Sequence, residues 1–389
     1  MISTNGRAAP VVSRCLGRWA FLILFVGILT GCSIFNGSSS KMAPLDLGPN
    51  VPLFSVRQVW TSRIGGVTAQ SFEVHASGDV LTLASLDGTV VALDPKTGAD
   101  IWRLSLGEPL SAGVGSDGKW TAVVSRSNQL VMIESGREIW RKPLSTQTFT
   151  SPLVAGDRVF VLAADRSVSS YDATTGQRLW SQSRPGESLV LRQSGVLTAV
   201  GDTLVVGLSG RLVGLNPLTG NVRWEVPLAV ARGTNDVERL VDLVGRPSRV
   251  ANSFCVRAFQ AAVGCIDSSS GRLSWIQTAH GITGLHGDSA VLFGSEANGS
   301  FVAWRRGDGT RLWTTDRLKY RKLTAPLLLG RSVVVADDTG LVHLLAKEDG
   351  SPMNRLMTDA SGVAMAPVVI SETLVVVTRN GGIYGFRPD

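Results

Sequence analysis

The stretch ALDPKTGADIW at residues 92–102 decides the fold, because the same phrase returns along the chain. Full copies are SYDATTGQRLW at 170–180, GLNPLTGNVRW at 214–224 and CIDSSSGRLSW at 265–275. In each copy an apolar run ends in Asp or Asn, Gly follows four residues later, and Trp stands four residues after Gly. An Asp or Asn side chain that accepts backbone N–H groups starts a turn, and glycine supplies the positive φ that such a turn needs. The phrase therefore predicts a hairpin whose second strand carries the Trp.

Shortened copies extend the series: Gly136 precedes Trp140, Gly309 precedes Trp313, and Gly350 precedes Arg355, where Trp is expected. The Trp-equivalent positions are 60, 102, 140, 180, 224, 275, 313 and 355, a period of about 42 residues. This period, with apolar alternation by two, is typical of one four-stranded blade of a β-propeller, whereas helical repeats need a period of about 3.6. We predict an all-β, eight-bladed β-propeller of four-stranded antiparallel blades. Seven blades are the alternative, if the degenerate copy near Arg355 does not form one.

The two ends of the chain predict how the ring closes. Only one strand's worth of chain, Ser55 to Val59, precedes Trp60, and the sequence stops after Ile383 to Phe386, the third strand of a blade. Pairing the N-terminal strand with the C-terminal strands would complete the last blade and remove a free sheet edge.

The first residues have the pattern of a lipoprotein export signal. A basic stretch ending at Arg18 precedes the apolar run 19–29, whose length as a helix, about 16 Å, is roughly half the hydrocarbon thickness of a bilayer. Leu29-Thr30-Gly31-Cys32 resembles a lipobox, in which the cysteine thiol takes a diacylglycerol; an ordinary signal peptide is the alternative.

Three segments follow from this pattern. We expect a signal peptide at 1–31, a lipidated Cys32 with a flexible tether at 32–54, and the propeller at 55–389. Ser33 after the cysteine implies, by the sorting rule of lipoproteins, export to the outer membrane. The chain would then be anchored by its lipid to the periplasmic face of that membrane without spanning it.

The net charge of +7 does not indicate a nucleic-acid partner. Three of the arginines lie in the first 31 residues, and the other basic residues are scattered apart from the small cluster Lys319, Arg321 and Lys322. With 44% hydrophobic and 18% charged residues, the chain has the composition of an ordinary globular protein. A solvated surface is the better interpretation of the charge.

Cys255 and Cys265 are the cysteines that remain once the signal peptide and Cys32 are set aside. They flank a turn-like stretch, Ala258 to Ala261, so an antiparallel pair of strands would place them opposite each other at disulfide distance in an oxidising periplasm. Two small buried thiols are the alternative. A zinc site is not expected, since no second Cys or His pair lies nearby at ligand spacing.

No catalytic constellation, metal or cofactor is expected. The run GVGSDGKW at 113–120 matches G-x-G-x-x-G, but a strand-like run follows it in place of the helix that a phosphate-binding loop needs. We interpret it as a hairpin loop. The four histidines are spread over four repeats, and Asp337-Asp338 fits a hairpin turn better than a cation site.

The repeat resembles the PQQ-type propeller repeat, which is named for quinoprotein dehydrogenases. Those enzymes usually carry two adjacent cysteines and hold calcium and quinone over a catalytic aspartate. Adjacent cysteines are absent here. The resemblance therefore implies the fold without the cofactor.

The lipobox, the tether and the propeller together resemble the BamB family, the lipoproteins of the outer-membrane β-barrel assembly (BAM) machine. Leu189-Val190-Leu191-Arg192 is similar to the Leu-x-Leu-Arg loop of that family, and Val237 to Asp242 is similar to its acidic loop. In the family these loops dock the periplasmic POTRA region of BamA, the barrel-forming subunit. The resemblance implies that Leu189, Leu191, Arg192 and Asp242 contact this partner. Val244 stands where the family often has a second acidic residue.

The residues by themselves also favour a binding loop here. The interval from Trp224 to Trp275 is 51 residues, about nine longer than the period, and additional residues in a propeller go to loops on one face. An apolar pair beside an arginine has the composition of an interface anchor. The alternative is that Leu189 and Leu191 are the inward positions of a blade's first strand.

These patterns predict a non-enzymatic scaffold that binds a BamA-like subunit and the rest of the BAM complex and assists the folding and insertion of outer-membrane proteins. Unfolded outer-membrane proteins are candidate substrates, bound by strand addition. The alternatives are a ligand-binding protein or quinoprotein-type enzyme of the periplasm that uses the central channel, and a scaffold of another envelope complex.

Overall fold

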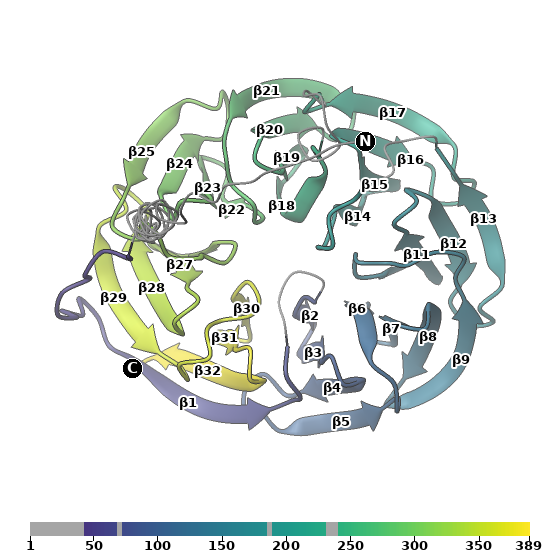
Figure 1. The fold of residues 1–389 in the computed structure, drawn as a ribbon, viewed down its shortest axis with the longest axis horizontal. Coiled ribbons are helices and arrows are strands. Elements are labelled where there is room, and N and C mark those ends of the chain that lie inside the picture. The colour runs from purple at the N-terminus through teal and green to yellow at the C-terminus, as the bar shows by residue number, and fades with distance from the viewer. Residues whose placement is uncertain (1–42, 68–71, 185–188, 231–239) are drawn as a thin grey trace, which may run out of the picture. The chain divides into compact units, whose positions relative to one another are not determined.

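The computed structural model describes residues 43–67, 72–184, 189–230 and 240–389. Within these residues every named strand belongs to one of eight four-stranded antiparallel sheets, and the sheets are arranged as a ring around a central axis (Figure 1). The prediction of an eight-bladed β-propeller is confirmed. The degenerate repeat near Arg355 forms a full blade, so the alternative of seven blades is wrong.

Each blade is one sheet, which extends from an innermost strand at the axis to an outermost strand at the rim. Blade 1 contains β2 (His75–Ser77), β3 (Val80–Ala84), β4 (Thr89–Leu93) and β5 (Asp100–Ser105), and blade 2 contains β6 (Leu110–Ser116), β7 (Trp120–Ser125), β8 (Gln129–Glu134) and β9 (Arg137–Pro143), in each case from the axis outward. Blade 3 contains β10 (Leu153–Ala155), β11 (Arg158–Leu162), β12 (Val168–Asp172) and β13 (Arg178–Gln182), and blade 4 contains β14 (Leu197–Val200), β15 (Thr203–Leu208), β16 (Arg211–Leu215) and β17 (Val222–Pro227). Blade 5 contains β18 (Leu243–Val250), β19 (Ser253–Ala258), β20 (Ala262–Asp267) and β21 (Arg272–Thr278), and blade 6 contains β22 (His286–Gly287), β23 (Val291–Ser295), β24 (Phe301–Arg305) and β25 (Arg311–Thr315). Blade 7 contains β26 (Leu327–Leu329), β27 (Ser332–Ala336), β28 (Leu341–Ala346) and β29 (Pro352–Met357), and blade 8 contains β30 (Val368–Ile370), β31 (Thr373–Val377), β32 (Gly382–Pro388) and β1 (Val56–Arg63).

Blade 8 is built from both ends of the chain, as predicted. β1 pairs antiparallel with β32, with Val56 opposite Pro388 and Arg63 opposite Gly382 (Figure 1). The N-terminal strand therefore covers the edge that the last three strands would otherwise expose.

The strand order places all connections between blades on one face of the ring. In blades 1 to 7 the chain runs from the innermost strand to the outermost one. The turn between the second and third strands therefore lies on the same face as the connection to the next blade. We call this the connector face; the other two turns of each blade lie on the opposite face.

Neighbouring blades are locked together through the repeated Trp and Gly. Each Trp lies on an outermost strand, and its ring covers the Gly in the last turn of the following blade: Trp60 covers Gly98, Trp140 covers Gly176, and Trp275 covers Gly309. The indole N–H donates to a carbonyl in the same turn, as from Trp60 to Pro95 at 3.0 Å and from Trp140 to Ala173 at 2.8 Å. These glycines have positive φ, and a Cβ on any of them would overlap the ring.

The junction between blades 7 and 8 differs, because blade 8 has no such turn. The strand register places Asn354, rather than the expected Arg355, at the Trp position, since Leu344 opposes Asn354 immediately before the bulge. The Asn354 side chain donates to the carbonyl of Phe54 at 2.8 Å, as the indole N–H does elsewhere. Arg355 donates to the carbonyl of Gly48 at 2.8 Å. Residues 45–54, which belong to the expected tether, thus lie along β29 where a turn lies in other blades.

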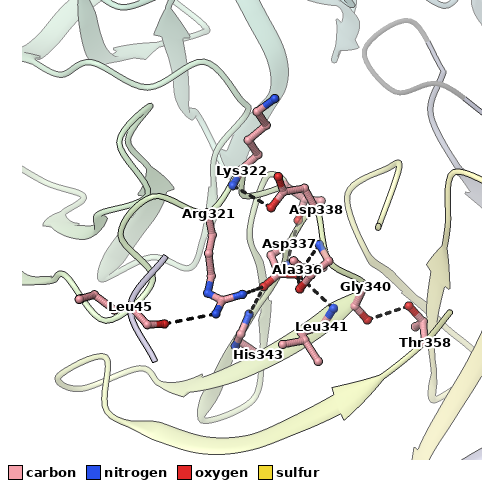
Figure 2. A network of polar contacts seen from close by, with 12 residues as sticks. Leu45, Arg321, Lys322, Ala336, Asp337, Asp338, Gly340, Leu341, His343 and Thr358 are labelled. Atoms are coloured by element: carbon pink, nitrogen blue, oxygen red, sulfur yellow. Dashed lines mark hydrogen bonds and ion pairs between the residues drawn. The ribbon is translucent and has the colours of Figure 1, made fainter. Parts of the chain in front are cut away.

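A buried ionic network holds this part of blade 7 (Figure 2). The carboxylate of Asp337 is fully buried and accepts hydrogen bonds from Arg321 at 2.9 Å and from the His343 Nε2–H at 3.0 Å. Arg321 also donates to the carbonyl of Leu45 at 3.3 Å. Burial raises the pKa of Asp337, but the hydrogen bonds from His343 and Thr339 outweigh it and hold the pKa well below its ordinary value. Asp337-Asp338 is therefore a hairpin turn between β27 and β28, as predicted from the sequence.

Two further local features can be compared with the sequence. Residues 113–120 contain the end of β6, a turn and the first residue of β7, so the glycine-rich run is a hairpin, as predicted. Cys255 on β19 and Cys265 on β20 are paired residues whose Cα atoms are 4.0 Å apart, and a disulfide joins them.

The contact between Trp275 and Gly309 can be tested with a pair of glycine substitutions. Both Gly309 and Gly330 have positive φ, but a Cβ at Gly309 would lie closer than 3.0 Å to the Trp275 ring, whereas a Cβ at Gly330 would meet nothing within 4 Å. We expect Gly330→Ala to lower the free energy of unfolding by about 1 kcal/mol through backbone strain. Gly309→Ala should lower it by about 2–4 kcal/mol, since overpacking adds to the strain. Urea unfolding of both variants measures the difference, and equal losses would show that the interlock does not stabilise the ring.

A buried histidine should make stability depend on pH. Burial, together with the positive charges of Arg246 and Arg306, lowers the pKa of His286 to about 4 from 6.5, and its Nδ1 accepts the Leu328 N–H at 3.0 Å. Between these two values the unfolded chain binds a proton that the folded chain does not, so the free energy of unfolding falls as the pH is lowered. We expect His286→Asn to remove about 2 kcal/mol of this pH dependence. Urea unfolding at several values between pH 7 and pH 4 tests this, with the exposed His280→Asn as the control; equal slopes in the wild type and the His286 variant would contradict it.

Candidate protein-docking site

Two connections on the connector face lie side by side. The segment from Leu189 to Val196 leads from blade 3 into β14, and Leu240 to Asp242 lead from blade 4 into β18. Gly195 and Val244 form an isolated antiparallel bridge, and the Gly245 N–H donates to the carbonyl of Ser194 at 2.9 Å. These backbone contacts fix the first connection to the start of β18, which directly follows the second connection.

Asp242 holds the first connection in place. Its carboxylate accepts the Leu191 N–H at 3.0 Å and the guanidinium of Arg166 at 3.3 Å. Arg166 also donates to the carbonyl of Leu189 at 3.0 Å. Arg166 lies in the turn between β11 and β12, has a φ of +63°, and is only 7% exposed. The carboxylate and the guanidinium therefore bind the backbone on both sides of Val190 and set the shape of this loop.

The outer surface of the loop carries apolar and cationic side chains. Leu189 is 40% exposed, and Arg192 is exposed. The Arg192 guanidinium lies over the ring of Phe149, 5.3 Å from its centroid. A cation–π contact of this kind orients the arginine while leaving its donors available to a partner.

The cavity beneath the loop is too small for a ligand. Its volume is about 50 Å³, and Phe149, Leu162, Leu191 and Leu243 are among its lining residues. Sites that enclose drug-sized molecules measure about 300–1,000 Å³. The loop is instead suited to contact another protein surface. It presents one exposed apolar side chain, Leu189, and one oriented guanidinium, Arg192, on a backbone held in place by hydrogen bonds.

The structure brings together the four residues expected to contact a partner. Leu189, Leu191, Arg192 and Asp242 lie within one pair of connections, although 50 residues of sequence separate the last two. The alternative in which the leucines belong to a first strand is wrong, because β14 begins at Leu197. Asp242 points into the loop and bonds it, so it supports the loop. The stretch from Val237 to Arg239, which is part of the predicted acidic loop, and Cys32, the predicted lipidation site, lie outside the described residues.

Arg166 and Phe149 were not expected from the sequence. Asp165-Arg166-Ser167 has the composition of any hairpin turn, and Phe149 stands in a short polar connection. Nothing in either stretch signals a contact with residues 189–192, because the contact depends on how blades 3, 4 and 5 are placed in the ring.

Within the described ranges, no group of three or more His, Cys, Asp or Glu side chains is placed to hold a metal ion. The same part of the chain contains no helix of the length and apolarity that crossing a membrane requires.

Sequence comparison shows the family to which the chain belongs. A family model described as Outer membrane protein assembly factor BamB matches residues 86–315. A Burkholderia pseudomallei protein of the same name is 37% identical over 364 residues, which are 93% of this chain and 95% of that protein. The chain belongs to the BamB family.

Solved structures share the ring. The crystal structure of BamB from Moraxella catarrhalis is 23% identical, has a TM-score of 0.78, and covers 86% of this chain and 100% of its own. Quinohemoprotein alcohol dehydrogenase from Comamonas testosteroni is similar at a TM-score of 0.65 with 12% identity, over 89% of this chain and 78% of its own. At these identities the two structures show the fold alone. Members of the BamB family and quinoprotein dehydrogenases thus share one architecture.

The role of Asp242 can be measured by removing its carboxylate. Asp242→Ala would leave the Leu191 N–H without its acceptor and would remove the carboxylate that pairs with the Arg166 guanidinium. We expect a loss of about 2–4 kcal/mol in the free energy of unfolding and faster hydrogen exchange at the Leu191 amide. Asp202→Ala is the control, because its 84% exposed side chain pairs with Arg223 at the surface, and it should cost less than about 1 kcal/mol. Unchanged exchange at Leu191 in the Asp242 variant would mean that the carboxylate does not brace the loop.

Proposed function

We propose that this protein is a non-enzymatic assembly factor for outer-membrane proteins, which docks on the POTRA region of a BamA-like subunit through the loop at residues 189–192. The observation that carries the proposal is the braced loop itself. Leu189 and Arg192 are exposed on it, while Asp242 and Arg166 hold its backbone. Membership of the BamB family supports the same role.

The hydrogen bonds that hold the loop should raise its affinity for a partner, because they order the loop before binding. A flexible loop loses conformational entropy when it binds, and that loss is subtracted from the gain of the contact. Here the hydrogen bonds to Asp242 and Arg166 order the loop before any partner arrives. We therefore assign Leu189, Leu191 and Arg192 to the contact with the partner and Asp242 to positioning the loop.

The location follows from the N-terminal pattern. We propose that Cys32 carries the lipid and holds the propeller at the periplasmic face of the outer membrane. The resulting confinement would place the docking loop near the other subunits of the BAM complex and near unfolded outer-membrane proteins, the proposed substrates.

No observation favours a quinoprotein-type enzyme. The cavity at the axis of the ring measures about 210 Å³, below the about 300–1,000 Å³ of sites that enclose drug-sized molecules. The name of the Burkholderia pseudomallei relative is that of an assembly factor, which supports a scaffold.

A binding titration tests the docking loop. Residues 33–389 without lipid would be titrated with the POTRA region of the BamA-like subunit from the same organism. We expect Leu189→Asp combined with Arg192→Glu to weaken binding at least about 30-fold, because both side chains are exposed anchors of the contact. Both changes lie at exposed positions, so circular dichroism should show an intact fold.

The matched control changes the same residue types on the opposite face. Leu218, in the last turn of blade 4, is 64% exposed, and Arg249, near the end of β18, is exposed. Leu218→Asp with Arg249→Glu should leave binding unchanged. Absence of binding by the folded wild type would overturn the proposed partner, and equal weakening by both double variants would overturn the loop assignment.

A further inference from the structure

A second cavity opens on the connector face, at the axis of the ring. Its volume is about 210 Å³, and it is lined mainly by the connections that lead into six of the eight blades. The polar part of the lining includes Glu73, Gln193, Arg246, Lys322 and Arg379. We call it the central cavity.

The central cavity carries uncompensated positive charge. Within the described part of the chain, the side chains of Arg246, Lys322 and Arg379 have no hydrogen-bond or ion-pair partner, and Arg246 and Lys322 are exposed at the cavity. Among the described residues of the lining the one acidic side chain is Glu73, which accepts the hydroxyl of Ser194 at 2.8 Å. Three cations therefore face one carboxylate.

The nearest acidic residues of blade 7 do not neutralise Lys322. Asp337 is buried and bonded to Arg321 and His343. Asp338 accepts the backbone N–H of Lys322 at 3.2 Å, while the Lys322 side chain extends away from both aspartates (Figure 2). The ammonium group is thus left for an anion that comes from outside the chain.

The positive charge of Arg246 also affects the pKa values of two nearby histidines, His75 and His286. Burial lowers the pKa of His75 and of His286, and the positive charge of Arg246 lowers both further. Both imidazoles are therefore neutral at pH 7, so the positive potential of the cavity belongs to the arginines and the lysine.

The size and the remaining lining restrict the occupant. Phe72, Ile282, Leu323 and Met365 are among the apolar lining residues. A volume of about 210 Å³ is below that of sites for drug-sized ligands, which measure about 300–1,000 Å³. The space suits one or two side chains that combine a carboxylate with an apolar neighbour.

The central cavity is continuous with the proposed docking loop. Gln193 lines both the central cavity and the small cavity beneath the loop, and its side-chain amide donates to the carbonyl of Ile282 at 3.1 Å. The next residue, Ser194, bonds Glu73 at the cavity wall. A partner seated on residues 189–192 is therefore adjacent to the cavity mouth.

We propose that the central cavity binds carboxylate groups, supplied by an acidic segment of the protein that docks on residues 189–192. The partner's place rests on the proposed function, whereas the carboxylate site rests on the cavity and its charges alone. A free small carboxylate has the same chemistry, and the experiment separates the two sources.

The first arm of the test needs no partner protein. Residues 33–389 would be titrated calorimetrically with the capped peptide Gly-Glu-Leu-Glu-Gly, with its Gly-Gln-Leu-Gln-Gly counterpart, and with glutarate. We expect the glutamate peptide to bind at least about tenfold more tightly than the glutamine peptide, because charge-assisted hydrogen bonds are about twice as strong as neutral ones. Arg246→Gln with Arg379→Gln should remove that preference. Arg249→Gln with Arg272→Gln, which removes two exposed cations of the opposite face, should retain it.

The second arm repeats the POTRA titration at low and at moderate salt. The cavity variant should bind about tenfold more weakly than the wild type and show a smaller salt dependence, since fewer charges are screened. The control variant should match the wild type. Lys322→Gln alone provides a second variant if the double substitution lowers the melting temperature.

The outcomes separate the two proposals. If the wild type binds the glutamate peptide but no POTRA region, the proposed partner fails and the carboxylate site stands. If glutarate binds and neither peptide does, the ligand is a small free carboxylate, which overturns the assignment to a protein segment. If both peptides bind equally, or the cavity variant keeps the preference, the carboxylate site itself is overturned.

Discussion

The ring depends on one contact that is repeated around it: a Trp of one blade lies over the Gly of the next blade's last turn. A four-stranded sheet cannot bury both of its faces alone, so each blade needs a neighbour on each side. The indole covers the turn and donates a hydrogen bond to it, as from Trp180 to Pro217 at 2.9 Å. Because the turn needs Gly both for its positive φ and for the space under the ring, turn geometry and blade packing are fixed by the same residue.

The junction between blades 7 and 8 shows what that contact requires. Blade 8 takes its outermost strand from the N-terminus, so no turn exists for a Trp to cover. Asn354 replaces the indole and donates to Phe54, and Arg355 bonds Gly48, which attaches the chain ahead of β1 to β29. The buried network around Asp337 extends this attachment to Leu45 through Arg321. The junction between blades 7 and 8 is thus polar, whereas the other junctions are aromatic.

Both proposed sites lie on the connector face. A ring held rigidly by its interlocks can present long connections without losing their relative positions, and the proposed docking loop and the central cavity both belong to that face. Asp242 comes from the connection between blades 4 and 5 and Arg166 from a turn of blade 3, yet both bind the backbone of the same loop. The same fold occurs in the quinohemoprotein alcohol dehydrogenase from Comamonas testosteroni, so the fold by itself does not decide the function.

The repeat phrase predicted the blades, because strand alternation, turn residues and the Gly–Trp spacing are local properties; the spacing recurs six times and once in a degenerate copy. The two ends of the chain predicted the closure, and the structure decided for eight blades over seven. The sequence also placed the glycine-rich run and Asp337-Asp338 in hairpins. Only the tertiary structure showed that each Gly contacts the preceding blade's Trp, that Asn354 occupies the degenerate position, and that Asp242 braces residues 189–191 together with Arg166. The unpaired cations of the central cavity were equally hidden, since they come from blades far apart in sequence. Strand and turn preferences depend on neighbouring residues and can be read from the sequence. These contacts join residues far apart in sequence, so they form only when the ring closes and brings distant connections to one face.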